Sequence, residues 1–119
     1  MESPTFTIDV KEEGNVYILL LNGYLDASTS HILDQAIQSI IQQSGKKLLI
    51  DCEHLSYISS AGLGIFMKHV DAIRNALGDM AFCTMQKPVF TVFDLLGFPV
   101  LFRICDDQQQ GLQFLTNEG

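Results

Sequence analysis

Apolar and polar residues first alternate along the chain and then run together, which predicts an opening β-hairpin. Residues 5–10 place apolar side chains at every second position, the period of a half-buried strand. Residues 16–21 are almost entirely aliphatic, and Glu13-Gly14-Asn15 between the two runs has the composition of a turn. We therefore expect two antiparallel strands, the second more deeply buried than the first.

A helical period replaces the strand period after the hairpin. Residues 25–30 are rich in residues that cap helices, and Ser44-Gly45 marks the end of the pattern. The apolar stripe between them has helical spacing over about three turns and consists of Ile32, Leu33, Ala36, Ile37, Ile40 and Ile41. Residues 48–52 then form a short apolar run, typical of a central strand covered on both faces.

A second amphipathic helix is predicted for residues 63–77. Apolar residues recur there at helical spacing, and Lys68 and Arg74 lie on the opposite side. Gly78 ends the pattern. Residues 80–85 are again apolar over a short run, so they form the next predicted strand.

The last third of the chain continues the alternation. A helix over residues 88–96 begins at a proline and stops at Gly97. Residues 100–105 are a predicted strand, and a final helix over residues 106–115 opens with two acidic residues, which the helix dipole favours. Strands that alternate with helices after a hairpin predict an α/β fold with a mixed sheet.

Length and composition are those of one globular domain spanning residues 1–119. With 47% hydrophobic residues and a mean hydropathy of +0.21, the chain can bury a core without a metal or a disulfide. The net charge of −7 excludes a nucleic-acid-binding class, because no basic stripe is present to neutralise phosphates. No apolar run reaches the roughly 20 residues of a membrane span, and the N-terminus lacks the pattern of a signal peptide. We expect a cytoplasmic protein without membrane insertion.

Three cysteines, Cys52, Cys83 and Cys105, lie in apolar, strand-like stretches. Their number is odd and no pair has the C-x-x-C spacing of a metal or redox motif. Buried free thiols are therefore expected, and no metal site is predicted.

Residues 57–64 carry the most distinctive local pattern. Ser59 and Ser60 stand next to small residues, and Gly62 and Gly64 follow just ahead of the predicted helix. Hydroxyls at a helix N-terminus lie where free backbone N–H groups gather, a place that suits a phosphate. The simpler interpretation is that one serine caps the helix and the glycines allow tight packing.

Catalytic and nucleotide-binding motifs are absent from this stretch. The G-x-S-x-G motif fails because Ile58 stands in place of its first glycine, and Met67 stands where a dinucleotide fingerprint has its third glycine. No P-loop is present. His54 and His69 are the nearby imidazoles, and both are expected at the surface or its boundary. No catalytic residue is predicted.

Two acidic residues, Asp26 and Asp51, fall at or just beyond the carboxyl ends of predicted strands. This edge is where α/β folds place their functional sites. Cap and turn chemistry is the alternative explanation for both residues.

Residues 51–64, preceded by Gly23-Tyr24-Leu25-Asp26, closely resemble the STAS domain of bacterial anti-sigma-factor antagonists. The Lys87-Pro88-Val89 region, Leu96-Gly97-Phe98 and the closing strand and helix also match, so the resemblance covers essentially the whole chain. It implies the STAS fold, a mixed sheet of about five strands with about four packed helices.

The resemblance also implies a function in partner switching. In this family the unphosphorylated antagonist binds an anti-sigma factor or related serine kinase and frees that partner's target. Phosphorylation releases the antagonist, and a PP2C-type phosphatase reverses it. The serine carried over from the motif is Ser60. Many members have Asp where this chain has Ser59, which leaves a second hydroxyl beside the site. The chain is then not an enzyme and holds no cofactor, because ATP and Mg²⁺ belong to the kinase.

The partner-binding surface implied by the resemblance combines the loop before the first helix with the turn that carries Ser60. Ordinary capping is the alternative for residues 27–29, and Leu63 is expected in the core. The surface consists of Asp26, Ala27, Ser28, Thr29, Ser30, Ser59, Ser60, Ala61, Gly62 and Gly64.

Two other functions stay open from the sequence. The same fold could serve as a STAS subunit of another signalling or transport-associated complex. In a different class, the helix N-terminus could belong to a small enzyme or anion-binding domain.

Overall fold

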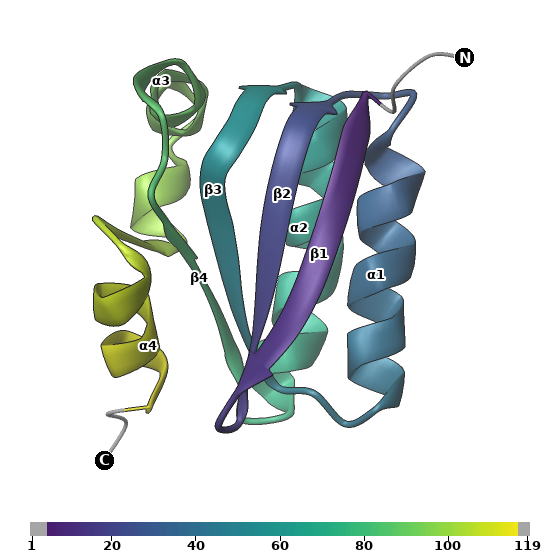
Figure 1. Ribbon diagram of the computed structural model, residues 1–119, viewed down its shortest axis with the longest axis vertical. Helices are drawn as coiled ribbons and strands as arrows, with labels where there is room; N and C mark the ends of the chain where they lie inside the picture. The colour runs from purple at the N-terminus through teal and green to yellow at the C-terminus, as the bar shows by residue number, and fades with distance from the viewer. Residues whose placement is uncertain (1–4, 117–119) are drawn as a thin grey trace.

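A computed structural model describes residues 5–116, which form one five-stranded sheet with helices on both faces (Figure 1). The elements follow the predicted order, a hairpin and then alternating helices and strands. They are β1 (Phe6–Glu13), β2 (Val16–Leu25), α1 (Ser30–Gln42), β3 (Lys47–Ile58), α2 (Ser60–Asn75), β4 (Asp79–Cys83), α3 (Lys87–Leu95), the 3-10 helix η1 (Phe98–Val100), β5 (Arg103–Cys105) and α4 (Gln108–Thr116).

The strands lie in the order β1-β2-β3-β4-β5. β1 is antiparallel to β2, and each later pair of neighbours is parallel. The α/β class, the mixed sheet and the opening hairpin are therefore confirmed. Because β2 to β5 run in the same direction, their carboxyl ends meet at one edge of the sheet.

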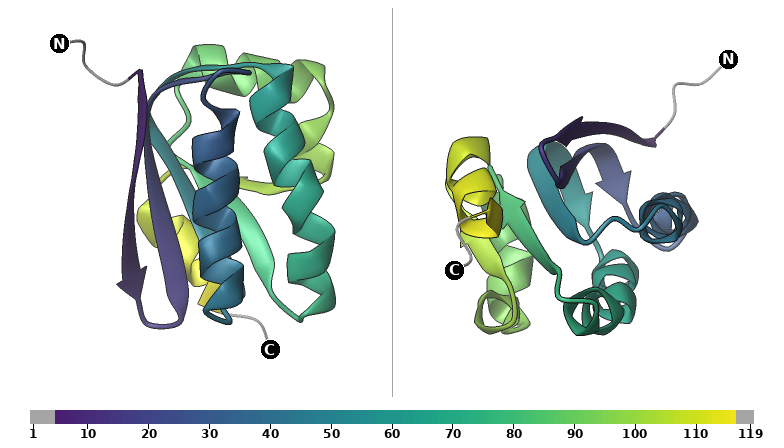
Figure 2. Two further views of the ribbon diagram at one scale, coloured as in Figure 1. Left: turned by 90° about the vertical axis from the view of Figure 1, so that its right-hand side faces the viewer. Right: turned by 90° about the horizontal axis from the view of Figure 1, so that it is seen from below.

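Helices α1, α2 and α3 cover one face of the sheet and α4 packs on the other, as the views in Figure 2 show. Phe82 of β4 lies at the centre of the larger core and meets the rings of Phe66, Phe93 and Phe102 edge-on, with centroids 4.9 to 5.1 Å apart. Beneath α4, a smaller core contains Leu49 and Leu115. Both faces of β3 are buried at its start, as predicted for a central strand.

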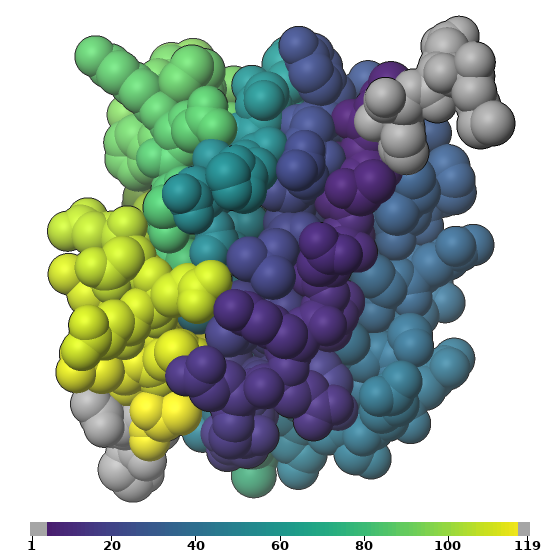
Figure 3. Space-filling view, viewed as in Figure 1, coloured from purple at the N-terminus to yellow at the C-terminus, as the bar shows by residue number. Residues whose placement is uncertain are grey.

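On the face turned away from α1 and α2, β1 and the second half of β2 carry no helix, whereas the start of β2 packs against α4 (Figure 3). Polar side chains are tolerated on this uncovered face, so β2 and β3 continue beyond the predicted residues 16–21 and 48–52. Polar residues such as His54 suggested a loop, but the backbone stays paired with β2 while these side chains face solvent. At Gly23, where φ is +104°, a Cβ would collide with the carbonyl oxygen of Thr5, so this stretch of β2 requires glycine.

The region before β5 differs from the prediction of a strand over residues 100–105. Phe98–Val100 form a 3-10 turn, and the amides of Leu101 and Phe102 both donate to the carbonyl of Phe98, at 2.9 and 3.0 Å. An apolar run does not distinguish a buried turn from a buried strand, because both bury side chains such as Phe102. β4 likewise ends at Cys83, so Met85 is outside it.

Asp51 was expected at the carboxyl end of a strand, and this is wrong. It lies within β3 on the face that packs against α4, where it is 3% exposed. The side chain of Gln108 donates to Asp51 Oδ2 at 2.7 Å, and the amide of Glu53 donates to Oδ1 at 2.9 Å. Asp51 therefore binds α4 to the sheet and lies away from the candidate site.

Candidate functional site

Two turns that are far apart in the sequence meet at the carboxyl edge of the sheet. β2 ends at Leu25 and β3 ends at Ile58, and these two residues are partners in the parallel ladder. The amide of Ser59 donates to the carbonyl of Leu25 at 2.9 Å. The turn that begins at Asp26 and the turn that carries Ser60 are thereby held side by side.

The first turn is closed by its own side chains. Asp26 Oδ1 accepts hydrogen bonds from the hydroxyl of Ser28 at 2.7 Å and from its amide at 2.9 Å. Thr29 Oγ1 accepts from the amide of Asp26 at 2.9 Å and donates to the carbonyl of Tyr24 at 2.8 Å. The bonds from Ser28, the hydroxyl bond first, hold the pKa of Asp26 below its usual value. The turn thus presents an ionised carboxylate before α1.

The members of this turn differ in exposure. Ala27 and Ser28 are exposed, Asp26 and Ser30 are half-buried, and Thr29 is buried. Thr29 is the N-cap residue of α1, but its side chain makes no capping bond and bonds instead to the backbone of Tyr24 and Asp26, so ordinary capping, the alternative explanation for residues 27–29, does not describe it. A partner can touch the others directly, whereas Thr29 supports the turn from inside.

The two serines of the second turn face different surroundings. Ser59 is the N-cap of α2, but its hydroxyl makes no capping bond, and its Oγ is buried with no hydrogen-bond partner among residues 5–116. Ser60 is the first residue of α2 and is exposed. Only the Ser60 hydroxyl of this pair is open to an approaching enzyme.

Local electrostatics at Ser60 favour an anion. The first turn of α2 carries no acidic residue. The free N–H groups of that turn and the positive end of the helix dipole lie beside Ser60. Of the nearby imidazoles, His69 is hydrogen-bonded to Asp34.

Gly62 and Gly64 have different environments. A Cβ at Gly62 would lie 2.6 Å from Leu25 Cγ, so this glycine lets the first turn of α2 pack on the end of β2. The close backbone approach that Gly62 permits is therefore an intramolecular one, between α2 and the end of β2. Gly64 is exposed, and a Cβ there would meet nothing within 4 Å. Ala61 is half-buried, and Leu63 lies in the core as expected.

A cross-helix cluster holds together the two helices that leave the site. Asp34 of α1 accepts from Lys68 Nζ at 3.0 Å and lies 2.6 Å from His69 Nε2 of α2. The His69 bond first, and Lys68 second, keep the pKa of Asp34 below its usual value. His69 is buried, at 7% exposed, so the expectation of a position at the surface or its boundary is wrong for it, whereas His54 is exposed as expected. Sequence reasoning missed the cluster because its members lie on separate helices.

The three thiols are free, and Cys52 and Cys83 are buried as predicted, while Cys105 is half-buried. Burial raises the pKa of Cys83 to about 12, which keeps this thiol protonated and unreactive. Among residues 5–116 no group of three or more His, Cys, Asp or Glu side chains is placed to hold a metal ion. Within the same residues, every helix is too short or too polar to cross a membrane.

The mixed sheet, with helices on both faces and its candidate site where β2 and β3 end, defines a domain of the α/β class. The family model for the STAS domain matches residues 7–111. The chain therefore belongs to the STAS domain family, which confirms the resemblance seen in the sequence.

The chain is similar to named relatives and to solved structures over nearly their whole length. The anti-sigma F factor antagonist of Paenibacillus polymyxa is 26% identical over 88% of this chain and 91% of its own. The anti-sigma-B factor antagonist of Bacillus subtilis is 24% identical over 89% and 96%. Among solved structures, the anti-sigma factor antagonist SpoIIAA in its unphosphorylated form superposes with a TM-score of 0.81 at 16% identity, over 95% of this chain and 99% of its own. The Bacillus SpoIIAA in its phosphorylated form gives 0.71 at 15% identity, over 91% and 98%.

Proposed function

We propose that this chain is an anti-sigma-factor antagonist that works by partner switching. Unphosphorylated, it binds an anti-sigma factor with serine kinase activity; phosphorylated on Ser60, it is released. The observation that carries the proposal is the exposed Ser60 hydroxyl at the first position of α2, beside the Asp26 turn. The names of the curated relatives and the existence of SpoIIAA in two phosphorylation states support it.

The geometry favours Ser60 over Ser59 as the modified residue. A kinase must bring its phosphate donor in line with the acceptor oxygen, so that oxygen has to be accessible. Ser59 Oγ is buried, and moving it outward would require the N-cap residue of α2 to rearrange. Ser60 needs no such change.

The domain itself should tolerate the phosphate. Phosphorylation adds about −1.5 to −2 charges and strong acceptor oxygens. At the N-terminus of α2 these meet free N–H groups and the positive dipole end, which stabilise an anion. The fold is therefore expected to persist in both states.

The complex, in contrast, should be weakened. A phosphate on Ser60 enlarges the surface that the partner must fit and has to be desolvated in the interface. The Asp26 turn presents a negative charge next to it, in a chain whose net charge is already −7. Affinity is then lost through steric and electrostatic penalties rather than through unfolding.

The proposed contact surface uses the accessible members of the two turns. Thr29, Gly62 and the Ser59 hydroxyl act from inside by fixing backbone positions. The residues that face the partner are Asp26, Ala27, Ser28, Ser30, Ser60, Ala61 and Gly64.

The remaining components belong to other proteins. The kinase holds ATP and Mg²⁺, so this chain needs no cofactor of its own. A PP2C-type phosphatase removes the phosphate and restores binding. Because the switch consumes ATP, we place it in the cytoplasm.

The test is to incubate the protein with the kinase encoded beside it and Mg-ATP, and to locate the phosphate by mass spectrometry. Ser60→Ala should abolish incorporation, and the neighbouring Ser59→Ala should leave it intact. Phosphate on Ser59 would contradict the assignment. With no incorporation at all, co-purification with a membrane or scaffold complex would favour a different STAS assembly. Turnover or anion binding by the isolated chain that Ser60→Ala abolishes would favour a small enzyme or anion-binding domain.

A further inference from the structure

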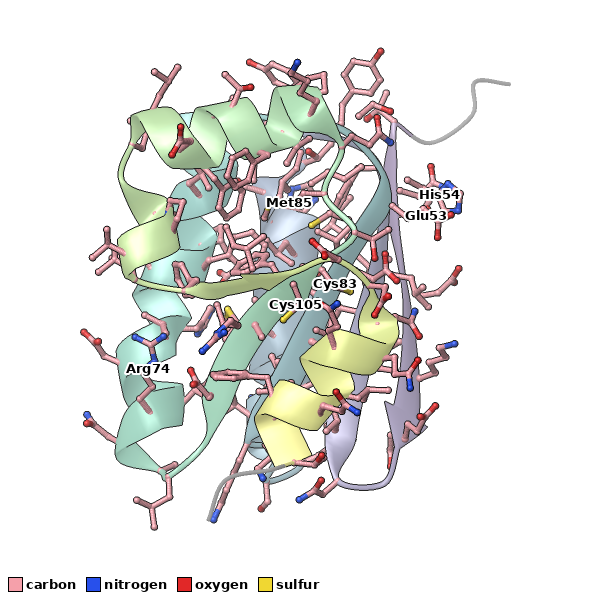
Figure 4. The ribbon with its side chains drawn as sticks, turned by 90° about the vertical axis from the view of Figure 1, so that its left-hand side faces the viewer. Glu53, His54, Arg74, Cys83, Met85 and Cys105 are labelled. Atoms are coloured by element: carbon pink, nitrogen blue, oxygen red, sulfur yellow. The ribbon has the colours of Figure 1, made fainter. Side chains whose placement is uncertain are left out.

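A groove of about 890 Å³ lies along β5, at the opposite end of the sheet from β1. Residues from α2, α3, β5 and α4 line it, and it shares none of them with the surface around Ser60. Figure 4, drawn from this side, shows β5 crossing between α3 and α4, with Arg74 and Met85 on either side of the strand. The proposed partner switch gives this groove no role.

Exposed apolar side chains gather on this side of the molecule. Half of the ten large apolar residues that are exposed in the described chain fall within residues 90–101. Of these, Phe90, Val100 and Leu101 line the groove directly, and Val100 is 89% exposed. An apolar concentration of this kind on a small acidic protein marks an interaction surface.

β5 is an edge strand with one open backbone position. The carbonyl of Cys105 accepts from the amide of Thr84, so the polar groups of Cys105 point toward β4. The backbone N–H and C=O groups of successive strand residues point to alternate edges of the strand. The N–H and C=O of Ile104 therefore point away from β4. The neighbouring outward amides are already used, since Phe102 donates to the carbonyl of Phe98 and Asp106 donates to Gln110 Oε1. Ile104 is therefore the position at which another chain can pair.

The groove also collects positive charge. Arg74, Lys87 and Arg103 line it, three of the seven basic residues in a chain of net charge −7, together with two carboxylates, those of Asp79 and Asp106. Arg74 is occupied, because its Nε lies 2.9 Å from Asp79 Oδ1. Lys87 and Arg103 are exposed and form no salt bridge within residues 5–116. The Arg103 guanidinium lies 4.7 Å from the Phe114 ring centre, which holds it in place with its donors available.

We propose that this groove binds an extended, acidic segment of a partner protein. The segment pairs with the N–H and C=O of Ile104, inserts an apolar side chain between α3 and α4, and places a carboxylate against Lys87 or Arg103. Backbone pairing supplies affinity and the groove supplies selectivity, the mode by which peptides add to sheet edges. The site would give the protein a second partner that binds whether or not Ser60 is phosphorylated.

Charge complementarity favours an acidic peptide over two other possible occupants, a second copy of the chain and a small apolar ligand. A second copy of the chain would bring another Lys87 and Arg103 to this edge, and among the lining residues only the Asp106 carboxylate, outside any salt bridge in residues 5–116, would offset their repulsion. A small apolar ligand would leave the outward groups of Ile104 and the two cations without partners. An acidic extended peptide satisfies all of these groups at once.

The test uses heptapeptides selected by display against the whole protein, with titration of the selected peptides in solution. The expected peptides are enriched in Asp and Glu relative to the starting library and have apolar residues at alternate positions. Arg103→Glu and Lys87→Glu should each weaken binding about tenfold. Ile104→Pro should weaken it similarly, because it removes an N–H that β4 does not use. Lys11→Glu, the same charge change on exposed β1, is the matched control and should leave affinity unchanged.

Melting temperatures of all variants establish that each one folds. Selection of neutral or basic peptides, or full binding by the folded Lys87→Glu and Arg103→Glu proteins, would overturn the proposal. Concentration-dependent dimerisation that Ile104→Pro abolishes would instead assign the edge to a second copy. None of these results depends on Ser60, so they test the groove independently of the partner-switch proposal.

Discussion

At the scale of single residues, two pairs of similar neighbours have different roles. Ser59 and Ser60 differ by one position, yet one hydroxyl is buried and the other is exposed. Gly62 and Gly64 differ by two, yet one packs against Leu25 and the other meets open space. The sequence shows each pair as near-equivalent, because position along the chain does not reveal which side of a helix start faces the sheet.

We predict that Ser60→Asp weakens binding of the kinase partner by about tenfold or more, as a first approximation to the phosphate charge. Thermal stability should be unchanged or slightly higher, since an acid in the first turn of a helix is favourable. Titration calorimetry and a melting curve measure the two effects. Gln109→Glu, which adds one charge in the first turn of α4, is the control and should keep wild-type affinity. Wild-type affinity in Ser60→Asp would contradict the electrostatic mechanism.

The two glycines give a second prediction. Gly62→Ala should destabilise the protein by about 1–3 kcal/mol, because the added methyl overlaps the Leu25 side chain. Gly64→Ala should stabilise it by about 0.5–1 kcal/mol, because alanine restricts the unfolded chain and meets open space in the helix. Urea denaturation at neutral pH compares them directly. Equal effects of the two substitutions would show that Gly62 is not packed as described.

At the scale of elements, the site depends on how α1 and α2 are held. Each helix begins at one of the two turns, and the cluster of Asp34, Lys68 and His69 joins them partway along. Helix positions were predictable from apolar spacing, and Gly97 ended α3 as expected, with φ at +74°. The contact between the helices was not predictable, since it depends on which polar faces the packing turns toward each other.

The cluster leads to a pH prediction. The folded-state pKa of Asp34 is lowered, so its stabilising contribution is complete above the unfolded value of about 3.9 and is lost as pH falls through the folded one. Asp34→Asn should lower the free energy of unfolding at pH 7 by about 1 kcal/mol, a modest figure because solvent reaches the side chain. Below about pH 3.9 the difference in free energy of unfolding between Asp34→Asn and wild type should decrease progressively. Denaturant titrations at several pH values measure it, and a constant difference would exclude the mechanism.

At the scale of the whole molecule, the two proposed binding surfaces lie on different edges of the sheet. The carboxyl ends of β2 and β3 present the Ser60 site, and β5 presents an apolar, basic groove at the side. The net charge of −7 does not reveal this groove, because its three basic residues lie on three elements that only folding brings together: Arg74 on α2, Lys87 on α3 and Arg103 on β5. The net charge of the chain therefore does not indicate the local charge at either edge.

The sequence by itself determined the α/β class, the order of the elements, the hairpin and the Ser-Ser-Ala-Gly turn that begins α2. These follow from local periodicity and from cap and turn chemistry, which depend on residues close together in the chain. Only the tertiary structure showed that Asp51 lies under α4, that β3 continues to Ile58, and that Ser60 rather than Ser59 is exposed next to the Asp26 turn. Burial and neighbourhood are set by contacts between distant segments, and no local pattern encodes them.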